Sequence, residues 1–174
     1  MRRKNVNNAI IRESITEALL RLMRQKSFSK ITVSEITQLA GVARVSFYRN
    51  YESKEDILVQ KLNEAALAWF GQLVKDADSD IVLGLFEHSL EMKEIALLVY
   101  RHNLSHLLLK NINDCVGSKP DNTAEEAYRN AYLAGSMFGV LDEWIRRGMI
   151  TSPETMSRIF LNYDIGLFLS KTNL

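Results

Sequence analysis

Apolar residues recur every three or four positions along most of the chain, which is the spacing of one buried helical face. In residues 7–26 they are Ile11, Ile15, Ala18, Leu19 and Leu22. We therefore predict a first amphipathic helix from Asn7 to Lys26. The polar segment that follows interrupts this period, and Phe28 with Ile31 is expected to pack beneath the helix as part of a small core.

A capping box opens the second predicted helix at Thr32. The Thr32 hydroxyl can accept a hydrogen bond from the backbone N–H of Glu35, while the Glu35 carboxylate can accept one from the N–H of Thr32. The helix ends at Gly41, because glycine adopts the left-handed backbone without a Cβ penalty. A third helix is predicted from about Arg44 to Tyr51, with Phe47 directed to the core. Two short helices joined by a tight turn are typical of a helix-turn-helix.

Three later segments begin with residues that cap helices. Ser53 can cap a long fourth helix. Thr123 opens a second capping box, and Ser152 followed by Pro153 is typical of the start of a last helix. Further helices are expected between the fourth helix and Thr123, where apolar residues keep the helical spacing.

Composition agrees with a helical chain. The 174 residues include 2 prolines and 8 glycines, so long helices are favoured over short strands joined by turns. We predict an all-α fold with a three-helix helix-turn-helix domain at residues 1–55 and a helical regulatory and dimerisation domain at residues 56–174. The boundary is expected to lie inside a helix.

Charge is distributed unevenly between the two parts of the chain. Residues 1–60 contain 11 Lys and Arg against 6 Asp and Glu, whereas residues 61–174 contain 11 against 15. The amino-terminal part is therefore the part suited to a polyanion. Solvated surfaces often show an imbalance of this size, so charge alone favours a nucleic-acid partner only slightly.

Nothing at the start of the chain predicts secretion, because polar residues follow the basic Arg2-Arg3-Lys4 where a signal peptide has an apolar segment. The longest apolar-rich run, Ala131 to Leu141, falls short of the ~18 residues that a membrane span needs. The single cysteine, Cys115, cannot form an internal disulfide, which fits a reducing compartment. We expect a soluble, cytoplasmic protein with no membrane partner.

Two motifs carry a more specific signal. They are I-T-V-S-E-I-T-Q-L-A-G-V-A, which ends in the turn, and S-F-Y-R-N-Y-E-S-K-E-D-I-L, which covers the third helix and the start of the fourth. Together with the first helix, the stretch from about Ile11 to Leu58 resembles the TetR (tetracycline-repressor) family of transcriptional regulators. The chain departs from the family at Ala43, where Ser is usual, at Val45, where Gly is frequent, and at Asn50-Tyr51, where His-Phe is common.

The resemblance implies double-stranded DNA as a partner, with the third helix in the major groove. Arg44 can bond both acceptors of a guanine edge, and Val45 can touch a thymine methyl. The implied DNA-binding residues are Thr32, Ser34, Arg44, Val45, Ser46, Tyr48, Arg49, Asn50 and Lys54. Thr32 could instead serve only as a cap and Tyr48 only as a packing residue. The basic tail could follow the DNA backbone, enter the minor groove or be disordered.

The segment Y-L-A-G-S-M-F-G-V-L-D-E-W-I-R-R-G-M-I-T-S-P-E resembles the penultimate helix and turn of one TetR subgroup. In that subgroup the last two helices pair with their copies, which implies a homodimer on an imperfect palindrome. The resemblance also implies a small-molecule effector site. Its candidate lining residues are Trp69, Phe86, Met92, Tyr100, Leu104, Tyr132, Phe138 and Leu141. Each of these could instead be an ordinary core residue.

No pattern in the sequence predicts catalysis or a bound metal. His102 and His106 have the spacing of a two-histidine half-site, but no acidic or cysteine partner stands at a matching position. We therefore expect no enzyme, no metal and no cofactor. The family resemblance implies a ligand-responsive transcriptional regulator, which we predict to be a repressor. The alternative is a TetR-like interaction protein that acts through another regulator, for which Ala43 and Val45 leave room.

Overall fold

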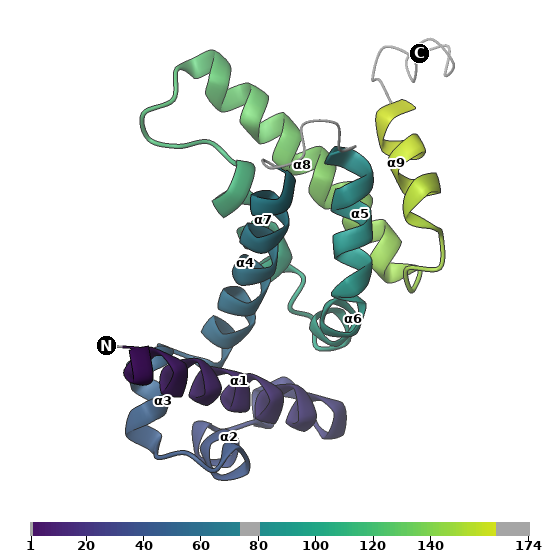
Figure 1. Ribbon diagram of the computed structural model, residues 1–174. Coiled ribbons are helices and arrows are strands. Elements are labelled where there is room, and N and C mark those ends of the chain that lie inside the picture. The colour runs from purple at the N-terminus through teal and green to yellow at the C-terminus, as the bar shows by residue number, and fades with distance from the viewer. Residues whose placement is uncertain (1, 74–80, 163–174) are drawn as a thin grey trace.

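The computed structural model describes residues 2–73 and 81–162, with side-chain surroundings for residues 8–67 and 81–162. Within these ranges the chain forms nine α-helices, one 3₁₀ helix and no strand, which confirms the predicted all-α fold (Figure 1). The elements are α1 (Arg2–Gln25), η1 (Phe28–Lys30), α2 (Val33–Ala40), α3 (Arg44–Asn50), α4 (Lys54–Leu73), α5 (Ile81–Glu91), α6 (Lys93–Arg101), α7 (His106–Val116), α8 (Ala124–Arg146) and α9 (Pro153–Asn162).

The first three helices form a small body at one end of the molecule (Figure 1). α1 begins at Arg2 rather than at the predicted Asn7, so the backbone of the basic tail belongs to its first turn. Phe28 and Ile31 are buried in the core beneath α1, as predicted. The same core contains Ile15, Leu19, Met23, Ile36, Phe47, Ile57 and Leu58.

Both predicted capping boxes are present. Thr32 Oγ1 accepts from the Glu35 N–H at 3.3 Å, and Glu35 Oε2 accepts from the Thr32 N–H at 2.9 Å. Thr123 and Glu126 make the same two bonds at 3.3 and 2.8 Å. These bonds satisfy N–H groups that have no partner inside the helix. They explain why α2 and α8 begin where the sequence predicts.

α4 connects the two parts of the molecule (Figure 1). Ser53 Oγ accepts from the Asp56 N–H at 3.1 Å, so Ser53 caps the start of this helix as predicted. Ile57 and Leu58, near that start, belong to the core beneath α1. The later turns of α4 pack against α5 and α7. One continuous helix therefore contributes to both parts.

α6 is a second element that contacts both parts. Ile95, Leu98 and Val99 of this helix lie in the core beneath α1, and Glu94 accepts from Arg24 Nε of α1 at 2.9 Å. Tyr100, also on α6, donates to Asp142 of α8 at 2.7 Å. α6 is thus fastened to α1 and to α8 at the same time.

The remaining helices form a bundle in which α5 lies beside α9 and α7 lies beside α8 (Figure 1). Its core includes Trp144 and Phe86, whose rings meet edge to face with centroids 5.5 Å apart. The Trp144 indole N–H donates to the Thr151 carbonyl at 3.0 Å, in the turn before α9. This bond and the buried Met156 hold α9 to the end of α8.

Candidate nucleic-acid interface and internal cavity

The turn between α2 and α3 determines which face of α3 is exposed. Gly41 has a φ of 67°, and the Val42 N–H donates to the Thr37 carbonyl at 3.0 Å, which closes the turn. Phe47 is completely buried, and its ring lies 5.9 Å from that of the buried Tyr51. α3 is therefore attached through one face, and its opposite face is exposed.

The exposed face of α3 carries an arginine–tyrosine pair. Arg44 Nη2 donates to the Tyr48 hydroxyl at 3.3 Å, and the guanidinium carbon lies 5.7 Å from the centre of the Tyr48 ring. Tyr48 is 53% exposed and Val45 57%. Because a guanidinium has five N–H donors, Arg44 retains donors for an approaching molecule. The face thus combines a cationic donor, a phenol and an apolar side chain.

The other predicted residues of α3 differ in what they leave available. Arg49 is exposed, whereas Ser46 and Asn50 are half-buried. Asn50 Nδ2 donates to the Ser46 carbonyl at 2.8 Å, so this amide is directed back to its own helix. Of these three residues, Arg49 is the best placed to reach another molecule.

Lys54, one of the predicted DNA-binding residues, is held by contacts within the fold. Its ammonium group donates to the Phe28 carbonyl at 2.6 Å and to the Ile31 carbonyl at 2.9 Å, and lies 4.5 Å from the centre of the Phe28 ring. An ammonium group has three N–H donors, so one remains beyond these two. Lys54 therefore fastens the start of α4 to the segment around η1, a contact that sequence reasoning missed.

At the start of α2, the Thr32 hydroxyl both accepts and donates a capping hydrogen bond. It accepts from the Glu35 N–H and donates to Glu35 Oε2 at 2.9 Å. Ser34 is exposed, and its hydroxyl makes no hydrogen bond within the residues that the structure describes.

The hydrogen bond from Lys26, followed by those from Thr32, lowers the pKa of the Glu35 carboxyl to about 2. Glu35 is therefore ionised at neutral pH and stabilises the start of α2.

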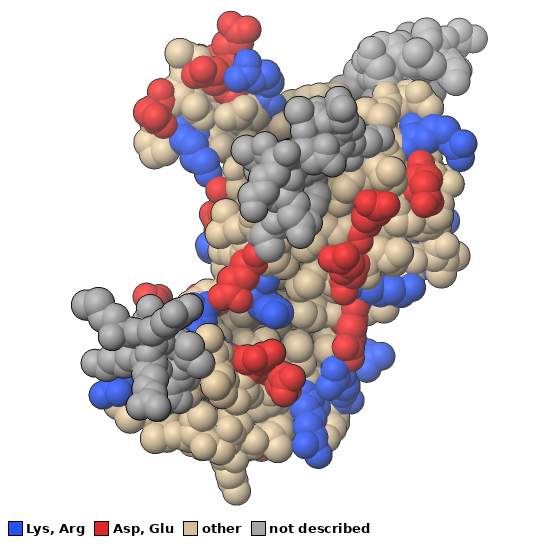
Figure 2. Space-filling view, in the orientation of Figure 1, with Lys and Arg blue, Asp and Glu red and all other residues tan. Residues whose placement is uncertain are grey.

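Charged side chains of both signs lie on both parts of the molecule in Figure 2, with two local concentrations. Figure 2 shows Lys and Arg side chains gathered where α1 ends, and a row of acidic side chains over α5 and α6. A polyanion would be attracted to the first region and repelled by the second. On this face, the region at the end of α1 is the one best suited to a polyanion.

A cavity of about 260 Å³, partly open to solvent, lies in the carboxy-terminal bundle. α4, α5, α6, α7, α8 and α9 all contribute to its wall. The lining residues are Leu62, Ala65, Ala66, Ile81, Val82, Leu85, His88, Ser89, Met92, Ala96, Leu108, Asn111, Ile112, Cys115, Val116, Leu133, Met137, Leu141, Ile145, Met149 and Phe160. Of the predicted effector-site residues, Met92 and Leu141 are among them.

Five of the other predicted effector-site residues are described and do not line this cavity. Phe86 is buried against Trp144, and Tyr100 hydrogen-bonds to α8. Leu104 packs on the core beneath α1 and Phe138 on the core of the bundle; Tyr132 is 55% exposed. The Trp69 side chain lies outside the described residues. An apolar residue at helical spacing can line a cavity, lie in a filled core or, like Tyr132, remain exposed, and the sequence does not distinguish these cases.

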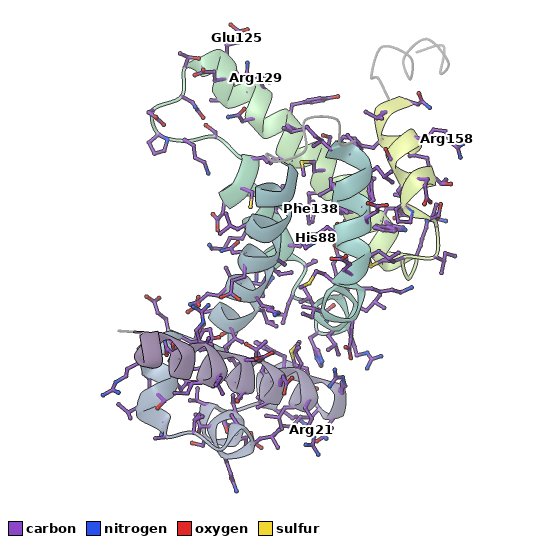
Figure 3. All side chains as sticks on the ribbon, in the orientation of Figure 1. Arg21, His88, Glu125, Arg129, Phe138 and Arg158 are labelled. Atoms are coloured by element: carbon purple, nitrogen blue, oxygen red, sulfur yellow. The ribbon has the colours of Figure 1, made fainter. Side chains whose placement is uncertain are left out.

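Four polar residues interrupt the apolar wall: His88, Ser89, Asn111 and Cys115. Figure 3 shows His88 of α5 and Phe138 of α8 inside the bundle. Cys115 as a whole is exposed, but partial burial of its thiol, followed by the nearby Asp114, raises the thiol pKa. Asn111 is only 7% exposed, and its Nδ2 donates to Asn63 Oδ1 of α4. Asn111 stands among apolar residues on the buried face of α7, and this pattern in the sequence could have identified it as a candidate.

His102 joins the two parts of the molecule. Its Nε2 lies 2.8 Å from the Met23 carbonyl, and its Nδ1 accepts from the Phe28 N–H at 3.3 Å. These bonds require the ring proton on Nε2. His106, the other half of the predicted pair, is exposed. In the described part of the chain, no group of three or more His, Cys, Asp and Glu could hold a metal ion.

None of the helices that the structure describes is both long and apolar enough to cross a membrane.

Comparison with known sequences identifies relatives of this chain. Residues 15–60 match the family described as bacterial regulatory proteins, tetR family. The HTH-type transcriptional regulator YxbF of Bacillus subtilis strain 168 is 22% identical over 182 residues, which cover 92% of this chain and 46% of YxbF. An HTH-type transcriptional regulator of Haemophilus influenzae is 32% identical over 73 residues, or 42% of this chain and 35% of that protein. The chain spans less than half the length of these relatives.

Solved structures share the fold over nearly the whole chain. A TetR transcriptional regulator from Streptococcus agalactiae 2603V has a TM-score of 0.56 at 22% identity and covers 91% of this chain and 95% of its own. The dihydroxyacetone kinase operon activator DhaS has a TM-score of 0.55 at 21% identity, with 95% and 97% covered. NalD, the secondary repressor of the MexAB-OprM multidrug efflux pump in Pseudomonas aeruginosa, has a TM-score of 0.52 at 19% identity, with 89% and 94% covered.

Proposed function

We propose, from the premise that this chain belongs to the TetR family of bacterial regulatory proteins, that it is a ligand-responsive repressor that binds a palindromic operator as a dimer. The observation that carries the proposal is the face of α3 on which Arg44, Val45 and Tyr48 are exposed while Phe47 anchors the helix from behind. The protein would act in the cytoplasm, with a domain boundary near residue 55.

In the proposed complex, α3 lies in the major groove with its first turn facing the base edges. Arg44 bonds a guanine through two N–H groups, and Val45 contacts a thymine methyl. Tyr48, Arg49 and the remaining N–H of Lys54 contact phosphates. Ser34 reaches the flank of the groove beside the capped Thr32.

The proposed dimer uses α8 and α9. Tyr128 and Tyr132 on α8 are 78% and 55% exposed, and Leu161 on α9 is 61% exposed. On the same side of α8, a Cβ added at Gly135 or Gly139 would meet no described atom within 4 Å. Large apolar and small residues along one stripe would let a copy of α8 approach closely. Such a dimer would present its α3 helices to half-sites ~34 Å apart or a multiple of that spacing.

The cavity is the proposed effector site. Ala96 of α6 lines it, while Glu94 and His102, at either end of α6, bond to the α1 side. An effector that favours a different position of α6 would shift α1 and α3, and so change the population of dimers with the operator spacing. This arrangement supports regulation without contact between effector and DNA.

Selection of genomic fragments bound by the purified full chain tests the proposal. We expect an imperfect palindrome whose affinity falls steeply with salt, because phosphate contacts release counterions. Arg44→Ala should reduce discrimination against a mismatched site by about 1–3 kcal/mol, with the circular dichroism unchanged. Arg129→Ala removes the same charge from the far end of α8 (Figure 3), and it should leave discrimination intact.

A folded dimer that enriches no fragment would contradict the operator proposal and favour the interaction-protein alternative. Ala43, at the N-cap of α3, makes no side-chain hydrogen bond, and Val45 places a branched side chain on the exposed face. Both departures from the family lie where base contacts are expected, which is the observation that supports this alternative.

A further inference from the structure

The wall of the internal cavity contains no charged Asp, Glu, Lys or Arg among the residues that line it in the described chain. All but His88, Ser89, Asn111 and Cys115 are apolar. The Ser89 hydroxyl donates to the Leu85 carbonyl at 2.7 Å within its own helix, and His88 Nδ1 lies 3.5 Å from Glu91. A carboxylate or ammonium group placed against the described wall would lose its hydration and would meet no Asp, Glu, Lys or Arg as a counter-ion, while His88 is already engaged with Glu91. The described part of the wall therefore disfavours charged ligands.

Asn111 is the polar group buried most deeply in the wall. It is 7% exposed, and its Nδ2 donates to Asn63 Oδ1 across the contact between α7 and α4. A carboxamide has two N–H donors and an oxygen with two acceptor sites. Within the described residues, the second N–H and the oxygen of Asn111 have no partner. Because buried polar groups are normally hydrogen-bonded, this half-used amide is an anchor for one polar group of a ligand.

The size of the cavity limits the apolar part of the ligand. An apolar cavity of about 150 Å³ in another protein holds benzene, and the cavity here is about 260 Å³. It is therefore large enough for a skeleton of two fused aromatic rings or an aliphatic group of similar bulk.

We propose that the cavity binds an uncharged, largely apolar molecule of about this size with one hydroxyl or carbonyl group hydrogen-bonded to the Asn111 carboxamide. This inference rests on the proposed effector site and adds the ligand's chemical class. The apolar skeleton fills the space between α4, α5, α7 and α8, and the polar group lies beside the Asn63–Asn111 pair.

Calorimetric titration of the full chain with four probes on one skeleton tests the chemistry. The probes are naphthalene, naphthol, naphthoate and naphthylmethylammonium. Naphthol should bind about fivefold more tightly than naphthalene because it adds one hydrogen bond to Asn111. Naphthoate and naphthylmethylammonium should bind at least about a hundredfold more weakly than naphthol because each would bury a charge.

Two variants assign the site. The Asn63→Leu, Asn111→Leu double variant removes both amides, so neither is left unpaired. It should bind naphthalene at least as tightly as the unaltered chain and lose the preference for naphthol. Ala66→Phe fills the cavity and should abolish binding of both neutral probes. Circular dichroism and urea unfolding establish that each variant is folded.

Tight binding of a charged probe, a naphthol preference that survives the double variant, or no binding of any probe by the folded chain would overturn the inference. Operator binding is measured on the same preparations without probe. Loss of probe binding with intact DNA binding would remove this inference and leave the DNA-binding proposal standing. Probe binding by a chain that recognises no operator would remove the DNA-binding proposal and leave this inference standing.

Discussion

The amino-terminal and carboxy-terminal helices bury similar apolar faces but use their interiors differently. Beneath α1, Ile15, Leu19, Ile36 and Phe47 are fully buried in one contiguous core. Between α4 and α9, the apolar faces surround a cavity of about 260 Å³. A filled core holds the side chains on its outer surface in fixed positions, which suits reading another molecule's surface. A hollow core can admit a small molecule.

This contrast predicts that a leucine-to-alanine substitution lowers the free energy of unfolding by different amounts in the two parts. The loss in the filled core is the largest effect that we expect. Leu19→Ala in the filled core should lower the free energy of unfolding by about 3–5 kcal/mol, because neighbours beneath α1 cannot close the new void. Leu108→Ala, at the half-buried cavity wall, should cost less than about 2 kcal/mol, because it enlarges an existing space and removes fewer contacts. Equilibrium urea unfolding measures both, and equal losses would contradict the contrast.

Local chemistry made much of the filled part predictable from the sequence. The capping bonds of Thr32 and Ser53 and the left-handed Gly41 depend on residues at most a few positions apart. They define where α2 and α4 begin and how the turn before α3 closes. Phe47 could be assigned to the core from the same short pattern. Which exposed residues of α3 contact DNA stays a prediction.

Contacts between distant segments were not predictable. Lys54 bonds to Phe28 and Ile31, and His102 bonds to Met23 and Phe28. Their partners depend on how α4 and α6 pack against the end of α1. The cavity has the same origin, because whether six helices meet around a space depends on their crossing geometry. The candidates chosen from the family resemblance include Met92 and Leu141, which line the cavity, but not the polar Asn111.

Substitution of Lys54 tests whether its hydrogen bonds at the start of α4 stabilise the amino-terminal core. Lys54→Met keeps an apolar stem of similar length but removes the bonds to two carbonyls, so we expect a loss of about 1–3 kcal/mol in the free energy of unfolding. Lys30→Met, at the exposed end of η1, is the matched control and should change stability little. If Lys54 also contacts a phosphate, the salt slope of operator binding should fall by about 1. Unaltered stability would show that the carbonyl bonds contribute nothing.

His102 tests the connection between the filled and hollow parts. His102→Ala removes the hydrogen bonds that the residue after α6 makes with Met23 of α1 and Phe28 of η1, with an expected loss of about 1–2 kcal/mol in the free energy of unfolding. His106→Ala, four residues further on and exposed, should have little effect. If α6 transmits effector binding, His102→Ala should also weaken the dependence of operator affinity on a neutral probe. Identical behaviour of the two variants would exclude His102 as a specific connection.

The smallest expected effect lies at the edge of the filled part, where Glu35 caps α2. Bonds from Lys26 and Thr32 lower the Glu35 pKa from 4.5 to about 2. Because the folded-state pKa lies below the unfolded one, ionised Glu35 adds stability above about pH 4.5 that is lost as the pH falls towards 2. Glu35→Gln keeps an oxygen for the Thr32 N–H but cannot ionise. The stability difference between the two proteins should be small at neutral pH and vanish between pH 4.5 and 2 in urea unfolding. A stability difference independent of pH would mean that Glu35 acts only as a neutral cap and that its negative charge does not stabilise the fold.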